Sequence, residues 1–146
     1  MKRTLHRNPA DDRFTFKLMN ENDAGRICHE IVREQIKAWV HNQGWSESKS
    51  RQVWVATWEA LQNAIKYGSS PGEQIGIGLC PEGEQGMRVE ISQTRPSWRE
   101  VIRDVKKTLS SKPEELPLGG AVIMYKLASG ISVSPDGRTV KLHFRE

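Results

Sequence analysis

The spacing of hydrophobic residues changes several times along the 146-residue chain, and these changes predict an alternation of strands and helices. Residues 13–19 alternate apolar with polar side chains, as a half-buried strand does. Asn20 to Asp23 are expected to cap a long helix that runs to about Asn42 and ends at Gly44. The later predicted elements are a helix at 53–68, strands at 74–80 and 87–92, helices at 98–109 and 119–130, and strands at 131–134 and 139–144.

The order of these elements predicts the fold class. Short turns at 81–86 and 135–137 join neighbouring strands into hairpins, so the sheet should be mixed but mainly antiparallel. Helices on one face of such a sheet make an α+β two-layer sandwich. Residues 1–12 are polar, and we expect a flexible N-terminal tail followed by a single domain at 13–146.

The helix at 53–68 is the element around which the chain is organised, because it carries two adjoining apolar stripes that can pack against two neighbours. The stripes consist of Trp54, Trp58, Leu61 and Ile65, and of Val53, Thr57, Ala60 and Ala64. Ser46 or Ser48 should cap this helix. Tryptophans 39, 54 and 58 are expected in the core.

Glu59 and Asn63 lie one turn apart on the remaining side of this helix. Such a pair is commonly part of a solvated polar face. Alternatively, both groups project into one pocket, where a carboxylate can accept a proton and an amide oxygen can bind Mg²⁺.

The ten residues from Glu59 to Gly68, Glu-Ala-Leu-Gln-Asn-Ala-Ile-Lys-Tyr-Gly, resemble the N-box of the GHKL ATPases. The resemblance is strongest to the RsbW-like anti-sigma-factor serine/threonine kinases, which also share the predicted element order over about 13–144. It implies a Bergerat fold with Glu59 as the catalytic base and Asn63 as the Mg²⁺ ligand. Lys66 and Tyr67 would lie beside the bound nucleotide.

The second nucleotide motif departs from the family pattern. The family has Asp-x-Gly-x-Gly, in which the aspartate binds the adenine amino group, whereas this chain has Gln93, Arg95 and Ser97 at those three positions. Gln93 can still accept a hydrogen bond but supplies no charge. The loss should cost about 1.5–3 kcal/mol, or about ten- to a hundredfold in affinity. Arg95 is not expected to replace a glycine that needs a positive φ.

Gly119 and Gly120 begin the predicted helix at 119–130, where backbone N–H groups and the helix dipole can hold a phosphate. The alternative is an ordinary turn. Their position after the N-box resembles the glycine-rich lid of the GHKL family, with Ser129 in place of a usual aspartate.

Composition adds weaker constraints. The chain has 36% hydrophobic residues, 27% charged residues and a formal charge of +4, which is typical of a soluble globular protein. Without a long Lys/Arg run, this charge suits nucleotide phosphates or an acidic protein as well as nucleic acid. Cys28 and Cys80 are expected to be reduced, and the sequence predicts no export signal, no membrane span and a cytoplasmic protein.

Three functions are therefore compared. The resemblance implies an ATP/ADP- and Mg²⁺-binding anti-sigma regulator and protein-serine kinase, which phosphorylates or sequesters a sigma factor or an anti-anti-sigma protein. By analogy it could pair as a homodimer. The first alternative is a protein-binding module of the same fold that has lost useful ATP affinity. The second is a small nucleic-acid-binding domain, supported only by the basic charge.

Overall fold

The computed structural model describes residues 14–20, 25–111 and 120–146. Its elements are β1 (Phe14–Met19), α1 (Gly25–His41), α2 (Glu47–Asn63), a π-helical turn η2 (Ala64–Gly68), β2 (Gln74–Pro81), β3 (Gly86–Ser92), α3 (Trp98–Ser111), α4 (Gly120–Leu127), β4 (Gly130–Val133) and β5 (Thr139–Arg145). The predicted order of strands and helices is confirmed. The predicted tail at 1–12 lies outside the described residues, and the division into tail and single domain stays a prediction.

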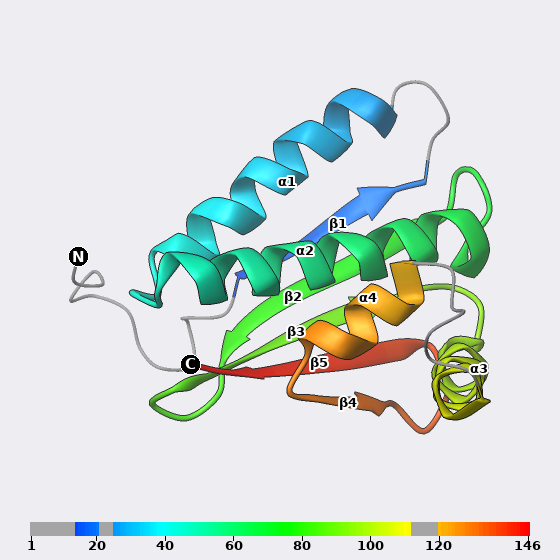
Figure 1. Ribbon diagram of the computed structural model, residues 1–146. Coiled ribbons are helices and arrows are strands. Elements are labelled where there is room, and N and C mark those ends of the chain that lie inside the picture. Colours follow the sequence, from blue (N-terminus) through cyan, green and yellow to red (C-terminus); the bar gives the residue numbers. More distant parts are fainter. Residues whose placement is uncertain (1–13, 21–24, 112–119) are drawn as a thin grey trace.

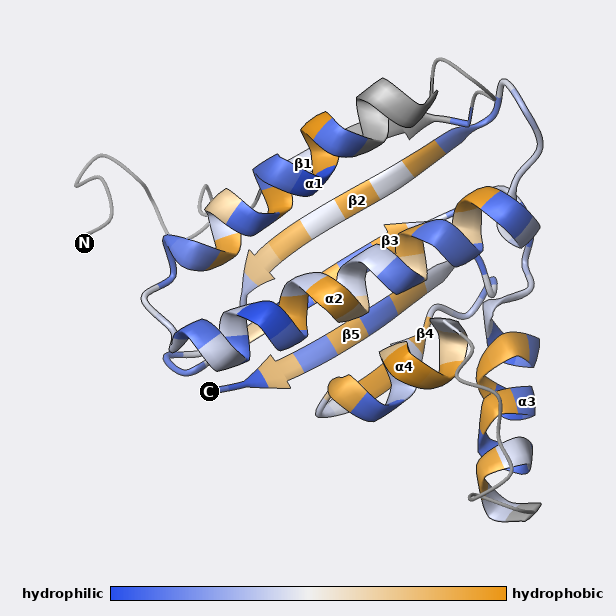
Figure 2. Cartoon of the chain, turned by 45° about the horizontal axis from the view of Figure 1, so that its top comes forward, coloured by the Kyte–Doolittle hydropathy of each residue, from blue (hydrophilic) through white to orange (hydrophobic). Residues whose placement is uncertain are grey.

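The five strands form one sheet in the order β1-β2-β3-β5-β4, and every pair of neighbours in it is antiparallel. Helices α1, α2 and α4 lie over the same face of this sheet, and α3 lies at one end (Figure 1, Figure 2). The predicted α+β two-layer sandwich is therefore confirmed. None of the described helices has the length and apolar run that crossing a bilayer requires.

Alternation along the strands places the core between the sheet and these helices. The inward-facing side chains of the three central strands are nearly or fully buried: Ile75, Ile77 and Leu79 on β2, Met87, Val89 and Ile91 on β3, and Val140, Leu142 and Phe144 on β5. Burying an aliphatic or aromatic side chain of this size contributes about 1.5–3 kcal/mol, so this double layer is the main source of stability.

Helix α2 crosses the centre of the helical layer. Ser46 is its N-cap, because its side chain accepts a hydrogen bond from the N–H of Lys49 at 3.2 Å. The fully buried residues of α2 are Val53, Ala56, Thr57, Ala60 and Leu61. The expectation that tryptophans 54 and 58 belong to the core is only partly correct, since both are half-buried at its margin.

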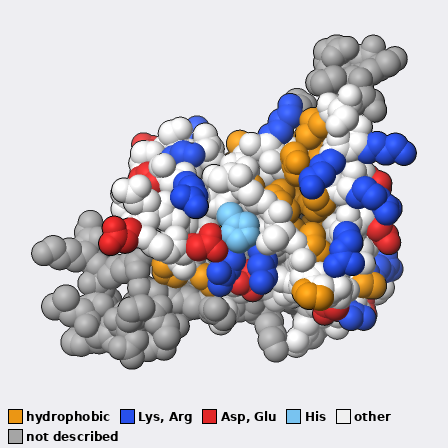
Figure 3. All heavy atoms as spheres, turned by 90° about the horizontal axis from the view of Figure 1, so that it is seen from below, with side chains coloured by type: hydrophobic (Ala, Val, Ile, Leu, Met, Phe, Trp, Pro, Cys, Tyr) orange, Lys and Arg blue, Asp and Glu red, His pale blue; other side chains and the backbone are white. Residues whose placement is uncertain are grey.

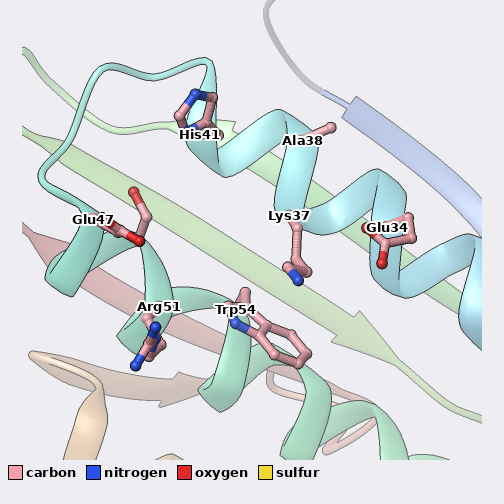
Figure 4. Close-up of a pocket in the computed structure, with 8 residues that line it drawn as sticks. Glu34, Lys37, Ala38, His41, Glu47, Arg51 and Trp54 are labelled. Carbon is pink, nitrogen blue, oxygen red and sulfur yellow. The ribbon is translucent and has the colours of Figure 1, made fainter.

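Trp54 instead lies at a groove of about 410 Å³ between α1 and α2 (Figure 4). The guanidinium of Arg33 lies 4.7 Å from the centre of its ring, and the ammonium of Lys37 lies 5.2 Å from it. These cation–π contacts explain how a large aromatic side chain is accommodated beside charged residues. Ile31, an apolar residue of α1, is 55% exposed.

Candidate functional site

The N-box residues Glu59 and Asn63 lie on the C-terminal half of α2, and both side chains are half-buried. Gly120 begins α4, which packs beside α2. A Cβ atom added to Gly120 would overlap Oε2 of Glu59 and lie 3.4 Å from its carboxyl carbon. The carboxylate therefore lies against the N-terminus of α4, where the helix dipole favours a negative charge. The structure brings Glu59 and Gly120 together, while Gly119 lies outside the described residues.

The helix that carries the N-box ends in the π-helical turn η2, and the carbonyl groups at its end need partners from elsewhere. The carbonyl of Ala64 accepts a hydrogen bond from the Ser69 hydroxyl at 2.8 Å, and that of Ile65 accepts one from Nδ2 of Asn20 at 2.9 Å. Asn20 Nδ2 also donates to Ser69 Oγ at 2.9 Å. Asn20 was expected to help cap α1, but its amide instead closes the end of α2.

Arg95 satisfies two further carbonyls of this turn. Its Nη1 donates to the carbonyl of Tyr67 at 2.9 Å, and its backbone N–H donates to the carbonyl of Gly68 at 3.0 Å. Its Nη2 lies 3.4 Å from Ser70 Oγ. Lys66 and Tyr67 are exposed, and the Tyr67 side chain is 64% accessible. The residue at the first glycine position of the adenine motif therefore clamps the turn that follows the N-box.

Gln93, at the position of the adenine-binding aspartate, is buried, with 6% of its surface exposed. Its Nε2 donates to the carbonyl of Arg95 and to Ser97 Oγ, both at 3.0 Å. A Cβ atom added to Gly68 would lie 2.7 Å from that Nε2 and would overlap Oε1. Oε1 is buried and has no hydrogen-bond partner within the described part of the chain. The amide of Gln93 thus fills the space beside Gly68, and the acceptor expected to bind adenine faces the backbone of this turn.

The loop of residues 93–97 does not require the glycines of the family motif. Within the described residues, only glycines have a positive φ, so Arg95 and Ser97 adopt ordinary backbone conformations. The condition under which Arg95 could not replace a glycine, a positive φ, therefore does not arise in this loop. Trp98, which follows, is completely buried, and its backbone N–H donates to the carbonyl of Gly137 at 3.1 Å.

A polar cluster that the sequence did not predict lies on the sheet side away from the helices. Nδ1 of His143 lies 2.9 Å from Oε1 of Glu82, and its Nε2 lies 3.1 Å from Ser132 Oγ. Arg88 contacts Glu82 at 3.2 Å and Glu90 at 2.7 Å. Burial raises the pKa of Glu82, but the hydrogen bond and charge of His143 and those of Arg88 outweigh it, so this pKa lies below its ordinary value.

Comparison with solved structures identifies two related folds. The chain superposes on the structure of the RsbU and RsbW domains of Rv1364c from Mycobacterium tuberculosis with a TM-score of 0.60 and 17% identity, covering 91% of this chain and 32% of that one. It superposes on the SiaB-SiaC complex from Pseudomonas aeruginosa with a TM-score of 0.59 and 15% identity, covering 90% of this chain and 88% of that one.

Sequence comparisons show less. No protein-family model matches the chain. A glycerol kinase of Leptospira biflexa serovar Patoc is 24% identical over 88 residues, which is 60% of this chain but only 18% of that enzyme. A match of this identity and extent assigns neither a family nor an activity. The structural matches, with the element order and sheet topology, instead confirm the predicted fold: the chain has an RsbW-like α+β fold.

Proposed function

We propose that this protein is a regulatory protein-binding module of the RsbW-like fold, which acts by sequestering a partner such as a sigma factor or an anti-anti-sigma protein. Two similar structures support the proposal, because one contains an RsbW domain and the other is a complex of SiaB with a second protein, SiaC. Both matches cover at least nine-tenths of this chain.

The contact between Gln93 and Gly68 is the main observation that favours a binding module over a kinase. A purine in the family position would need the side chain of residue 93 to face an open pocket. Here the Gln93 amide is buried, donates two hydrogen bonds within its own loop and occupies the space beside Gly68. The residues present therefore do not fit an adenine ring.

The phosphate end of the site supports the same conclusion. The N-terminus of α4, where the sequence predicted a phosphate, already has the Glu59 carboxylate against Gly120. A second anion there would repel this carboxylate unless a cation came with it. The rival function is an ATP-dependent protein-serine kinase, with Glu59 as base and Asn63 on Mg²⁺. The unpartnered, buried acceptor Oε1 of Gln93 favours that rival.

Calorimetry with Mg-ATP and Mg-ADP separates the two functions. We expect no binding heat at millimolar nucleotide for the wild type or for Asn63→Ala. The triple variant Gln93→Asp/Arg95→Gly/Ser97→Gly, which restores the family motif, shows whether the rest of the site can still hold a nucleotide. Wild-type binding that Asn63→Ala abolishes, together with transfer of labelled phosphate from ATP to a partner, would establish the kinase.

A second experiment tests binding to a partner protein. Purified sigma factors and anti-anti-sigma proteins of the source genome are titrated against the wild type without nucleotide. The proposal expects a stable complex with at least one of them, seen by gel filtration and calorimetry. If no complex forms without nucleotide but one forms with Mg-ATP, sequestration by a nucleotide-independent module is wrong.

A further inference from the structure

Three turns meet at the end of the sheet that carries α3 (Figure 1): residues 66–70, 93–97 and 134–138. Backbone hydrogen bonds join them, from Arg95 N to the carbonyl of Gly68 at 3.0 Å and from Gln93 N to the carbonyl of Arg138 at 2.9 Å. They form one continuous surface. Its exposed side chains, which we call the basic end, are Lys66, Tyr67, Arg95, Arg99 and Arg138.

The three arginines of the basic end are held by backbone carbonyl groups. These bonds join Arg95 to Tyr67 (2.9 Å), Arg99 to Ser134 and Pro135 (3.1 Å each), and Arg138 to Thr94 (2.9 Å). A carbonyl orients a guanidinium but does not neutralise it, and each guanidinium has five N–H donors in a planar fork. The side chains are therefore held in place, which reduces the conformational entropy lost when a ligand binds. Each guanidinium still has N–H donors that can bind an anion.

Acidic side chains compensate this charge only in part. Asp136 lies 3.9 Å from Nη1 of Arg138, while its carboxylate accepts hydrogen bonds from Ser134 Oγ and from the N–H of Arg138. The carboxylate of Glu73 is bonded to the N–H of Ser70. Seen from below, Lys and Arg side chains gather on the half of the molecule that carries α3 (Figure 3).

Tyr67 gives this charged surface an apolar centre. Its side chain is 64% exposed, although Arg95 holds its carbonyl and so fixes its backbone. Tyrosine and arginine are enriched among the residues that dominate binding energy at protein interfaces, and here Arg95 is bonded to the carbonyl of Tyr67. Arg95 occupies a glycine position of the family's nucleotide motif, so the departure from that motif supplies a cation to this surface.

We propose that the basic end docks an acidic segment of the partner protein, with carboxylates on the arginines and an apolar side chain of the partner packed on Tyr67. This inference rests on the proposed function and names the chemistry of its partner. A nucleic-acid site fits less well, because the chain has no long Lys/Arg run to follow a phosphate backbone, and one of the two similar structures is a complex between two proteins.

The test measures fluorescence anisotropy with a labelled short peptide of glutamate and leucine, and with its glutamine-for-glutamate counterpart. We expect the wild type to bind only the acidic peptide, with an affinity that falls as salt rises. Tyr67→Ala and Arg95→Gln should each weaken binding about tenfold or more. Arg99→Lys keeps the charge but loses the fork, so a smaller loss is expected. Arg51→Gln, an exposed arginine near the other end of α2, is the matched control and should change nothing.

Because Arg95→Gln also removes a bond to the turn, Lys66→Gln tests the charge at an exposed position without that bond, and thermal melting checks that each variant is folded. The proposal is overturned if Arg51→Gln weakens binding as much as Tyr67→Ala does. Tighter binding of a labelled oligo-dT, lost in the same variants, would make this a nucleic-acid surface, and complete displacement of the peptide by inorganic phosphate would reduce it to an anion site.

The same variants separate this inference from the proposed function. A partner complex that survives Tyr67→Ala and Arg95→Gln rejects the basic end but leaves sequestration intact. A wild type that binds none of the candidate partners, yet shows the expected peptide pattern, rejects the proposed partners and keeps the surface.

Discussion

Replacing Gly68 by alanine should destabilise the protein, although alanine is ordinarily the better residue in a helical turn. The backbone of Gly68 has no positive φ, so alanine fits its conformation and should gain up to about 1 kcal/mol from helix propensity. Against this gain, the new methyl group would overlap the amide of Gln93, which is buried and cannot swing into solvent without breaking its own hydrogen bonds.

The cost can be worked from these contacts. Overpacking a closed site costs about 1–3 kcal/mol. Expelling the Gln93 amide forfeits two hydrogen bonds, to the carbonyl of Arg95 and to Ser97 Oγ, of about 0.5–1.5 kcal/mol each. These losses add to about 2–6 kcal/mol, and after subtraction of about 1 kcal/mol for helix propensity, Gly68→Ala should lower the free energy of unfolding by about 1–5 kcal/mol.

A double-mutant cycle with urea denaturation isolates the contact. Gln93→Ala alone should cost about 1–2 kcal/mol, because it leaves the carbonyl of Arg95 without its donor. In the double variant the methyl group has room, so the double variant should be more stable than the sum of the single losses by about 1–2 kcal/mol. Losses that add within about 0.5 kcal/mol would refute the contact between these two side chains and, with it, the argument that the purine site is closed.

Three further substitutions test other parts of the structure. Asn20→Ala should lower the free energy of unfolding by about 2–3 kcal/mol in urea, because its amide is the shared donor to two buried acceptors; an unchanged midpoint would contradict this. Since the pKa of Glu82 is lower in the folded state, its stabilisation is complete above the unfolded-state pKa and is lost as pH falls through the folded one. The melting temperature of Glu82→Gln should therefore fall less steeply than that of the wild type as the pH is lowered. A parallel fall in the two proteins would contradict the contact with His143. Ser46→Ala should cost about 1 kcal/mol and Ser48→Ala almost nothing, and the reverse order would identify Ser48 as the cap.

The fold could be predicted because its determinants are periodic and local. Alternation in residues 74–80 and 87–92 correctly indicated two half-buried strands, and helical spacing located α2. The predicted helix end at Gly68 was also correct, although the last turn is π-helical. The exposure of Ile31 could not be predicted, because spacing identifies an apolar stripe but does not show whether a neighbour covers it.

The candidate site could be located but not read completely. The N-box sequence placed Glu59 and Asn63 near the end of a helix, where both side chains are half-buried. The glycine pattern placed Gly120 at the start of a later helix, and Gly120 lies against Glu59. The contact between Gln93 and Gly68 could not be predicted in this way. It joins residues 25 positions apart, and no local sequence pattern encodes it. The proposed role of each residue in binding stays a prediction.

The hydrogen bond from Asn20 to Ile65 links the residue that directly follows β1 to a turn 45 positions later. β1 is an edge strand, paired only with β2, and edge strands detach more readily than central ones during sub-global opening. When β1 detaches, the carbonyl of Ile65 loses its hydrogen bond from Asn20, and the π-helical turn η2 at the end of α2 is destabilised. Amide hydrogen exchange at residues 66–68 should therefore occur at rates similar to those in β1. The pairing of β1 with β2 would then determine how long the surface proposed for partner binding, which includes Lys66 and Tyr67, keeps its conformation.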